Sequence, residues 1–128
     1  MRIMITGATG FVGSHLVQQA ADAGHRVIAL CRGGARSEHA AETFRWSFGE
    51  IIPADAAKNS DCAIHLAYDF NGERGAERTR ISTLKAISEL RASGVARQLV
   101  FSSFSAGEHA ISLYGRTKFA IENGVKND

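Results

Sequence analysis

The octapeptide TGATGFVG at residues 6–13 constrains the fold of this chain more than any other feature of the sequence. The apolar run Arg2–Thr6 precedes it, and apolar residues at helical spacing follow it until Gly24, a residue suited to ending a helix. The three glycines of the octapeptide therefore lie where a buried strand turns directly into an amphipathic helix.

Each glycine has a mechanical role in such a strand–turn–helix unit. Gly7 permits a tight turn, Gly10 lets the backbone approach a ligand, and Gly13 lets the helix pack close to the strand. The free N–H groups at the helix start, around Phe11 and Val12, then face an anion and are assisted by the helix dipole. We expect this turn to bind the diphosphate of a dinucleotide, the alternative being a purely structural turn.

Apolar runs alternate with helical patterns along the rest of the chain, which is typical of a parallel sheet covered on both faces. Crossovers between parallel strands are almost always right-handed, so the topology is restricted further. We predict an α/β fold with a doubly wound parallel sheet (Rossmann) of about five strands in the order 3-2-1-4-5. The expected strands are Arg2–Thr6, Arg26–Cys31, Phe44–Phe48, Cys62–Ala67 and Gln98–Ser102.

The helical patterns lie between these strands. Residues 51–60, which hold the only proline, predict a loop or a short helix. A polar link over residues 69–75 precedes a long helix that ends near Gly94, and a last helix is expected over residues 114–123. Four apolar residues of the long helix share one face: Ile81, Leu84, Ile87 and Leu90.

The end of the second strand is where a dinucleotide-binding sheet selects its cofactor. An acidic residue there binds the ribose hydroxyls of NAD, whereas an arginine accommodates the 2′-phosphate of NADP. The sequence has Cys31 and then Arg32 at this point, with Arg36 close behind and no acid before Glu38. A guanidinium can hold a phosphate through two hydrogen bonds. We therefore predict NADP as the preferred cofactor and NAD as the alternative.

A second group of residues suggests proton chemistry. Tyr114 and Lys118 are four residues apart in SLYGRTK, so on a helix they lie on one face. The ammonium is expected to lower the phenol pKa from its usual value of about 10, which makes the phenol a usable acid or base. Ser102 and Ser103 end the fifth strand, where a hydroxyl can contact a carbonyl or alcohol oxygen of a ligand.

Four stretches together resemble the extended branch of the short-chain dehydrogenase/reductase superfamily, the NAD-dependent epimerases and dehydratases: TGATGFVG, DCAIHLA, GVARQLVFSS and YGRTKFAIE. The resemblance covers essentially the whole chain. It implies that Tyr114 is the catalytic acid/base, that Lys118 binds the nicotinamide ribose and tunes the tyrosine, and that Ser103, rather than Ser102, orients the reacting oxygen. The implied cofactor-binding residues are Gly7, Thr9, Gly10, Phe11, Val12, Gly13, Arg32, Leu66, Ala67, Tyr68, Tyr114 and Lys118, with residues 66–68 near the nicotinamide half.

The sequence also departs from that family. Thr79 occupies the position where members usually carry an asparagine that anchors the backbone and relays protons. The loop between Ser103 and Tyr114 is short, and Glu108 and His109 within it are expected to be solvated loop residues rather than extra acid/base groups. His65, in the fourth strand, is expected to be a packed core histidine.

The length of the chain gives a further expectation. It ends at Asp128, ten residues after Lys118, whereas the extended branch places its substrate-binding part after this helix. We therefore expect residues 1–128 to be an NAD(P)-binding Rossmann domain truncated at the C-terminus, with the substrate-binding part absent. The fifth strand would then be an open apolar edge, which favours a homo-oligomer formed through that edge.

Composition excludes several classes of partner. The net charge is +2 with both signs interspersed, which gives no reason to expect nucleic acid or an anionic membrane. No window approaches the about 18 apolar residues of a membrane span, and the opening apolar run is too short for a signal peptide. Cys31 and Cys62 lie in strand-like runs and are expected to be buried thiols in a reducing cytoplasm. No histidines or cysteines have metal-ligand spacing.

Two functions remain open from the sequence. The first is the cofactor-binding part of an epimerase-, dehydratase- or reductase-type oxidoreductase that acts on a small molecule, either a carbonyl compound or a nucleotide sugar. The second is a catalytically inactive dinucleotide-binding module with a sensor or interaction role. The retained Ser103, Tyr114 and Lys118 favour the first function.

Overall fold

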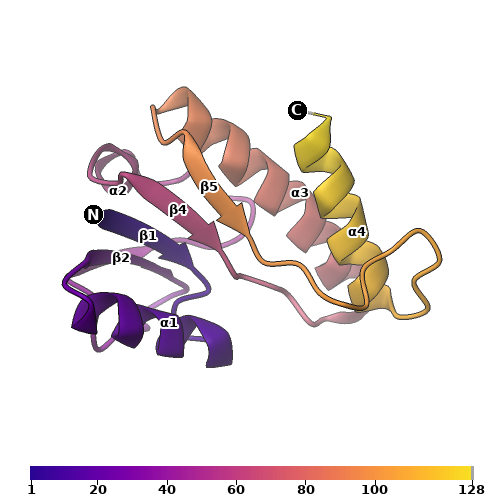
Figure 1. Ribbon diagram of the computed structural model, residues 1–128, viewed down its shortest axis with the longest axis horizontal. Coiled ribbons are helices and arrows are strands. Elements are labelled where there is room, and N and C mark those ends of the chain that lie inside the picture. Colours follow the sequence, from indigo (N-terminus) through magenta and orange to yellow (C-terminus); the bar gives the residue numbers. More distant parts are fainter. Residues whose placement is uncertain (128) are drawn as a thin grey trace.

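The computed structural model describes residues 1–127 and shows one five-stranded parallel sheet in the order β3-β2-β1-β4-β5, which confirms the predicted fold and strand order (Figure 1). The strands are β1 (Arg2–Thr6), β2 (Arg26–Cys31), β3 (Glu42–Arg45), β4 (Cys62–His65) and β5 (Arg97–Val100). The helices are α1 (Phe11–Asp22), α2 (Ala54–Lys58), α3 (Gly72–Ala92) and α4 (Leu113–Lys126).

Helices cover both faces of the sheet, as the continuous apolar strands require. On one face, Met4 and Leu30 pack against α2 and α3, through residues that include Leu90. On the other face, Ile5 and Ala29 pack against α1. Helix α4 lies along α3 on the side away from the sheet centre (Figure 1).

The register aligns the carboxyl ends of the strands at one rim. Thr6 at the end of β1 pairs with Leu30 of β2 and with His65 of β4. Cys31 pairs with Arg45 at the ends of β2 and β3, and His65 pairs with Val100 at the ends of β4 and β5. The chain leaves β1 toward α1 and leaves β4 toward α3 on the opposite face. Ligands of doubly wound sheets bind in the crevice that this reversal creates.

Three strands end earlier than the apolar runs predict, because their last residues leave the sheet. The third strand is Glu42–Arg45 rather than 44–48, and β4 and β5 each end two residues early. Trp46 follows β3 directly: its side chain packs into the core, and its N–H donates a hydrogen bond to the Cys31 carbonyl oxygen. After β4, the N–H groups of Leu66 and Ala67 donate to Thr6 Oγ1 instead of to a strand partner. Apolar side chains therefore continue past the end of each ladder.

The long helix also differs from the prediction at its start. It begins at Gly72 rather than after residue 75, and its buried face includes Thr79 and Ala86. Ile87 and Leu90 are buried as expected, whereas Ile81 is 50% exposed, because the helix face that meets the sheet passes through neighbouring residues. Residues 54–58 form a short helix, one of the two alternatives predicted for residues 51–60.

Strand β5 forms an edge of the sheet, with β4 as its one neighbour among residues 1–127. Leu99 within it is 57% exposed, and Phe101 just beyond it is 42% exposed. None of the helices formed by residues 1–127 has both the length and the apolar character needed to cross a bilayer.

Candidate functional site

The turn between β1 and α1 is packed too tightly for side chains at two of its glycines. Gly7 has a φ of 67°, and a Cβ there would lie 2.7 Å from the backbone nitrogen of Ala67. A Cβ on Gly13 would lie 2.0 Å from the Gly7 carbonyl oxygen. The predicted roles of Gly7 in the turn and of Gly13 in close packing are therefore seen in the structure. A Cβ on Gly10 would meet the Gly7 carbonyl oxygen at 3.3 Å, so this position is less crowded.

The start of α1 has backbone N–H groups that no side chain of residues 1–127 caps. Its N-cap is Gly10, without a capping side chain, and the first turn contains no acidic residue. The first backbone N–H groups of a helix have no intrahelical partner, and the helix dipole makes this end partly positive. The side chains of Phe11 and Val12 are exposed. This helix start can bind an anion.

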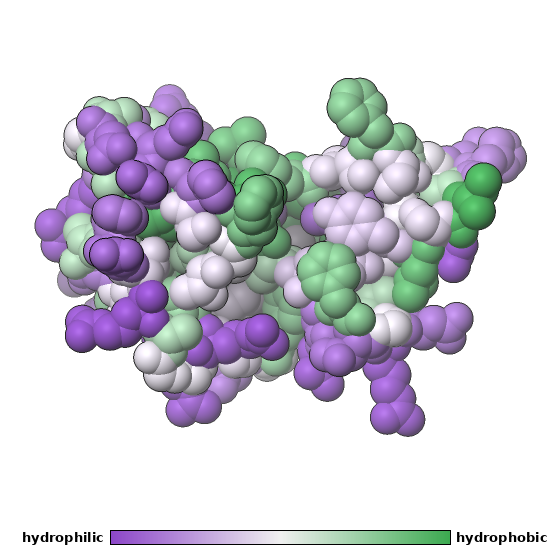
Figure 2. Space-filling view, turned by 90° about the horizontal axis from the view of Figure 1, so that it is seen from below, coloured by the Kyte–Doolittle hydropathy of each residue, from purple (hydrophilic) through white to green (hydrophobic). Residues whose placement is uncertain are grey.

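A hollow of about 720 Å³ opens at the carboxyl rim in front of this turn. Seen from below relative to Figure 1, hydrophobic side chains lie on both sides of a central depression (Figure 2). All twelve residues predicted to bind a cofactor line the hollow: Gly7, Thr9, Gly10, Phe11, Val12, Gly13, Arg32, Leu66, Ala67, Tyr68, Tyr114 and Lys118. The structure thus brings together residues from four separate segments.

Helix α4 directs Tyr114 and Lys118 at the same end of the hollow. Lys118 is only 4% exposed, and its Nζ donates a hydrogen bond of 2.8 Å to the carbonyl oxygen of Phe101, just after β5. The same Nζ lies 5.5 Å from the ring centroid of Tyr114 and 5.7 Å from that of Tyr68. The ammonium is thus held between α4, the end of β4 and the end of β5.

The phenol of Tyr114 stands in an aromatic cluster that changes its expected acidity. Its ring centroid lies 4.8 Å from that of Tyr68 and 6.1 Å from that of Phe70, which stacks on it nearly in parallel. Burial, and then Tyr68, raise the pKa of Tyr114, whereas the sequence predicted a lowered value. The ammonium of Lys118 is itself desolvated, which lowers its pKa, and it bonds to a carbonyl. The phenol is therefore a proton donor near neutral pH in this state.

The two serines after β5 have different surroundings. Ser102 lines the hollow, and its hydroxyl donates to Oε1 of Glu122 on α4. Ser103 is not among the residues that line the hollow. Its Oγ accepts a hydrogen bond of 3.1 Å from the N–H of Ser105 and lies 2.9 Å from Ser105 Oγ.

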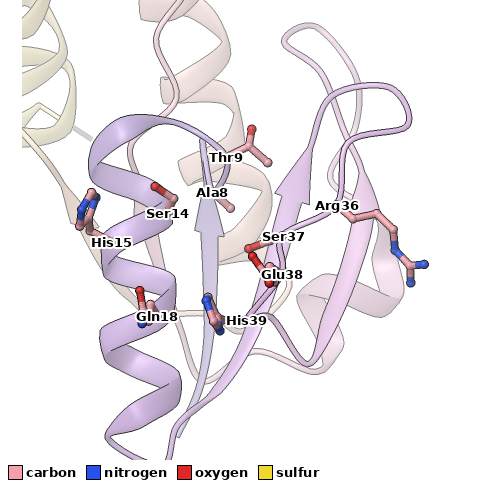
Figure 3. A pocket seen from close by; sticks show the side chains of 9 residues that line it. All are labelled: Ala8, Thr9, Ser14, His15, Gln18, Arg36, Ser37, Glu38 and His39. Carbon is pink, nitrogen blue, oxygen red and sulfur yellow. The ribbon is translucent and has the colours of Figure 1, made fainter.

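The two arginines after β2 separate into different parts of the surface. Arg32 lines the main hollow beside Cys31. Arg36 instead lines a second hollow of about 350 Å³ between α1 and residues 36–39, and its guanidinium points away from α1 (Figure 3). Arg32 is therefore the arginine placed to meet a ligand of the main hollow.

Several lining residues were not predicted from the sequence: Trp46, Ser47, Phe48, Asp69, Phe70, Arg78 and Phe101. Residues 46–48 follow β3 directly, so the rule that parallel strands present their carboxyl ends at one rim could have identified them. Residues 69 and 70 continue the link that starts with the predicted residues 66–68. Arg78 lines the hollow and forms an ion pair of 3.6 Å with the Asp69 carboxylate. No sequence pattern indicates this ion pair.

The Asp69 carboxyl is 9% exposed and organises the link between β4 and α3. It accepts hydrogen bonds from the backbone N–H and the side-chain amide of Asn71. The N–H bond from Asn71 is the main reason why the pKa of Asp69 is lowered, with smaller contributions from Arg78 and Arg32. Asp69 is therefore a fixed negative charge at the wall of the hollow.

Thr79 anchors the backbone between β4 and α3. It is fully buried, and its Oγ1 accepts from the N–H of Asp69 at 2.9 Å and donates to the carbonyl of Gly75 at 2.7 Å. This hydroxyl uses its only proton on the backbone, so it is not available to relay a proton to a ligand.

Three titratable candidates lie outside the hollow: His65, Glu108 and His109. His65 is 4% exposed and its Nε2 bonds to Gln98 Oε1 at 2.8 Å. Burial lowers the pKa of His65, which confirms a packed core histidine. Glu108 and His109 are exposed loop residues, as expected. Cys31 and Cys62 are free and buried.

Comparison with known proteins relates this geometry to one family. The model of the NAD dependent epimerase/dehydratase family matches residues 3–127. An uncharacterized protein of Schizosaccharomyces pombe is 34% identical over 117 residues, which cover 83% of this chain and 38% of that protein. The ceramide reductase of Caulobacter vibrioides is 30% identical, with 97% of this chain and 41% of that enzyme covered. This chain therefore spans about two fifths of these relatives.

Among solved structures, MoeE5 in complex with UDP-glucose and NAD is similar over nearly the whole chain. The TM-score is 0.82 at 26% identity, and the match covers 97% of this chain and 48% of that one.

Proposed function

This chain belongs to the NAD dependent epimerase/dehydratase family. We propose that residues 1–128 form an NAD(P)-binding Rossmann domain like that of the longer family members. The remainder of a full-length relative would supply most of the substrate pocket, since the match spans only 38% and 41% of two relatives. The activity would be that of an oxidoreductase-type enzyme, an epimerase, dehydratase or reductase.

The observation that carries this proposal is the single hollow lined by all twelve predicted cofactor residues. The diphosphate would lie at the uncapped start of α1, against the backbone of Gly10 to Gly13. The adenosine end would extend toward Arg32 at the end of β2. The nicotinamide end would lie toward Tyr68, Tyr114 and Lys118.

The reaction would combine hydride and proton transfer at one carbon–oxygen bond. A bound nicotinamide supplies or accepts the hydride at its C4. When a carbonyl is reduced, Tyr114 would donate its phenolic proton to the oxygen, and in the reverse direction it would take that proton back. Lys118 would hold the ribose and stabilise the phenolate that forms. Ser103 would orient the reacting oxygen, which requires its hydroxyl to turn from Ser105 toward the ligand.

The substrate we propose is a small carbonyl compound or a nucleotide sugar. MoeE5 supports the nucleotide sugar, because its structure contains UDP-glucose together with NAD. The ceramide reductase supports a carbonyl compound of another kind. Turnover with UDP-glucose, set against reduction of simple ketones, would separate the two classes.

We propose NADP as the preferred cofactor, with NAD as the alternative. The support is Arg32, which stands after β2 in the hollow, where an acidic residue would favour NAD. Arg32→Ala should weaken NADPH by roughly tenfold and NADH by less, since a charged hydrogen bond contributes about 1.5–3 kcal/mol. Equal weakening of both ligands would contradict this preference. Arg36→Ala, at a position outside the main hollow, is the matched control.

Titration of the chain with NADH and NADPH tests the proposal directly, with nicotinamide fluorescence and thermal stability as readouts. At about 100 times its dissociation constant, a ligand should stabilise the fold by about 2.7 kcal/mol. If neither nucleotide changes fluorescence or stability, the proposed function is wrong. A smaller effect of Gly13→Ala than of Arg36→Ala would also contradict it.

A catalytically inactive dinucleotide-binding module is the second candidate. It is favoured by the raised pKa of Tyr114 and by the position of Ser103 outside the hollow. Tyr114→Phe separates the two functions, because it removes the acid/base but keeps the aromatic ring. An enzyme should lose about 10²–10⁴-fold in turnover with its binding retained. A module would show binding and no turnover in either form.

We also propose a cytoplasmic homo-oligomer that forms through the open edge of β5. The exposed Leu99 and Phe101 support the association, and the two free cysteines are compatible with a reducing compartment. Light scattering after size exclusion should show more than one copy, and Leu99→Lys should shift the chain to a monomer.

A further inference from the structure

One face of α4 carries three functional groups at intervals of one turn: Tyr114, Lys118 and Glu122. The first two line the hollow. Glu122 lies one turn further along and contacts the segment that leaves β5. Neither the predicted site nor the proposed reaction uses this carboxylate.

Two successive turns of α4 hold two successive residues after β5. Lys118 Nζ donates to the Phe101 carbonyl oxygen at 2.8 Å, and Glu122 Oε1 accepts from the hydroxyl of the next residue, Ser102. Both Phe101 and Ser102 line the hollow. Helix α4, which carries Tyr114 and Lys118, therefore also fixes the part of the wall formed by the exit of β5.

The direction of the second bond determines what Ser102 can offer a ligand. A carboxylate only accepts hydrogen bonds, and a serine hydroxyl has one proton and two acceptor lone pairs. Because the proton of Ser102 is directed at Glu122, the oxygen presents only its lone pairs to the hollow. Ser102 can accept a hydrogen bond from a ligand but cannot donate one.

Ser103 has the opposite arrangement. Its oxygen already accepts from the backbone N–H of Ser105, and its proton is free to go to Ser105 Oγ or to a ligand. The neighbouring serines are therefore differentiated by their partners, one as an acceptor and one as a donor. A donor is what a reacting carbonyl oxygen needs, so Ser102 is not suited to that task.

We propose that Glu122 is a positioning residue that keeps Ser102 as a hydrogen-bond acceptor for the nicotinamide half of a bound dinucleotide. This inference rests on the proposed function. The nicotinamide half offers neutral donors at this end of the hollow, namely the ribose hydroxyls and the carboxamide NH₂. The ribose hydroxyls and the carboxamide can each donate a hydrogen bond to an acceptor oxygen, and ligands that lack one of them show which one Ser102 binds.

The test compares ligand affinities in matched variants of the whole chain. Ser102→Ala should weaken NADH by about fivefold to tenfold, the usual effect of one hydrogen bond. Glu122→Met removes the acceptor at similar length and should weaken NADH by a similar factor. Glu122→Gln keeps an acceptor oxygen and should restore affinity to within about twofold of the unaltered chain. The double variant Ser102→Ala/Glu122→Met should be no weaker than Ser102→Ala, because both changes break one pathway.

Two further ligands make the readout specific. ADP lacks the nicotinamide half, so its affinity should not change in any of these variants. ADP-ribose has the second ribose but no carboxamide. Weakened ADP-ribose would assign the donor to the ribose hydroxyls, and unchanged ADP-ribose would assign it to the carboxamide.

Several results would overturn the inference. Equal losses for ADP and NADH in Glu122→Met, or additive losses in the double variant, would show a merely structural role for Glu122. Unchanged NADH affinity in Ser102→Ala would overturn this inference alone. Absence of NADH binding by the unaltered chain would overturn the proposed function, and this inference with it.

Discussion

The two ends of the hollow are built in different ways. At the β1–α1 turn, the wall is backbone: glycines whose missing side chains let Gly7 approach Ala67, and uncapped N–H groups at the start of α1. At the opposite end the wall consists of side chains, with Lys118 and Glu122 bonded to the exit of β5. The glycines of the first end are set by local spacing in the sequence, whereas the second end depends on side-chain contacts between α4 and the exit of β5.

This difference predicts how substitutions at each end affect the protein. A substitution at the backbone end should damage the fold, because the atoms that it displaces belong to the main chain. A substitution at the side-chain end should change binding or titration and leave the fold in place. The following predictions test that contrast.

Gly13→Ala should have the largest effect, since its Cβ would lie 2.0 Å from the Gly7 carbonyl oxygen. We expect a loss of about 3 kcal/mol in the free energy of unfolding, measured by urea denaturation. Gly34→Ala is the matched control, because a Cβ there meets nothing within 4 Å. Similar stabilities of the two variants would contradict the expectation that substitutions in the β1–α1 turn damage the fold.

Thr79→Val should have the next largest effect and sharpens the comparison, because here a side chain anchors the backbone. The isosteric change leaves the Asp69 N–H and the Gly75 carbonyl without their bonds to Oγ1. We expect a loss of about 2 kcal/mol in unfolding free energy. Thr79→Ser should recover most of that loss, and a valine variant as stable as the unaltered chain would contradict the assigned anchoring.

Lys118→Met should weaken NADH by about tenfold while ADP binding stays unchanged. The pH dependence of stability provides a second measurement. Burial lowers the pKa of Lys118, so the unfolded chain binds more protons between this lowered value and about 10.4. Stability should therefore rise with pH in that window, and the methionine variant should lack this contribution. Equal slopes in both proteins would contradict the assigned burial.

The smallest expected effect is a shift in a single titration. The chain has only two tyrosines, so Tyr68→Phe leaves Tyr114 as the one phenol to follow by ultraviolet absorbance. Since burial is the main cause of its raised pKa, the remaining phenol should still titrate above the ordinary value of about 10. Titration below that value would mean that Lys118 already activates the phenol without a ligand.

The same contrast explains what could be predicted from the sequence. The positions of Gly7, Gly13, Tyr114 and Lys118 in the hollow were predictable, because each prediction depends on fixed spacing within one turn or one helix. The strand order was predictable from the alternation of apolar runs with helical patterns, together with the right-handed crossovers of a doubly wound sheet. The end of β3 was predicted too late, because Trp46 is apolar and buried although it lies beyond the last strand residue.

What escaped prediction depends on side chains that meet only in the folded chain. Phe70 stacks on Tyr114, and Ser102 donates to Glu122, across 44 and 20 residues of sequence respectively. The direction of the Tyr114 pKa was wrong for the same reason. Spacing places an ammonium near the phenol, but burial of the phenol, the electrostatic effect of Tyr68 and the bond from Lys118 to Phe101 are tertiary effects.

The alignment of the strand ends has one more consequence. Most of the lining of the hollow comes from links, helix faces and the last residues of strands. A replacement at Ser47, Phe70 or Ser102 exchanges a surface group without touching a ladder hydrogen bond. The sheet can therefore stay constant while evolution changes the ligand-binding loops separately, and with them the chemistry of the site.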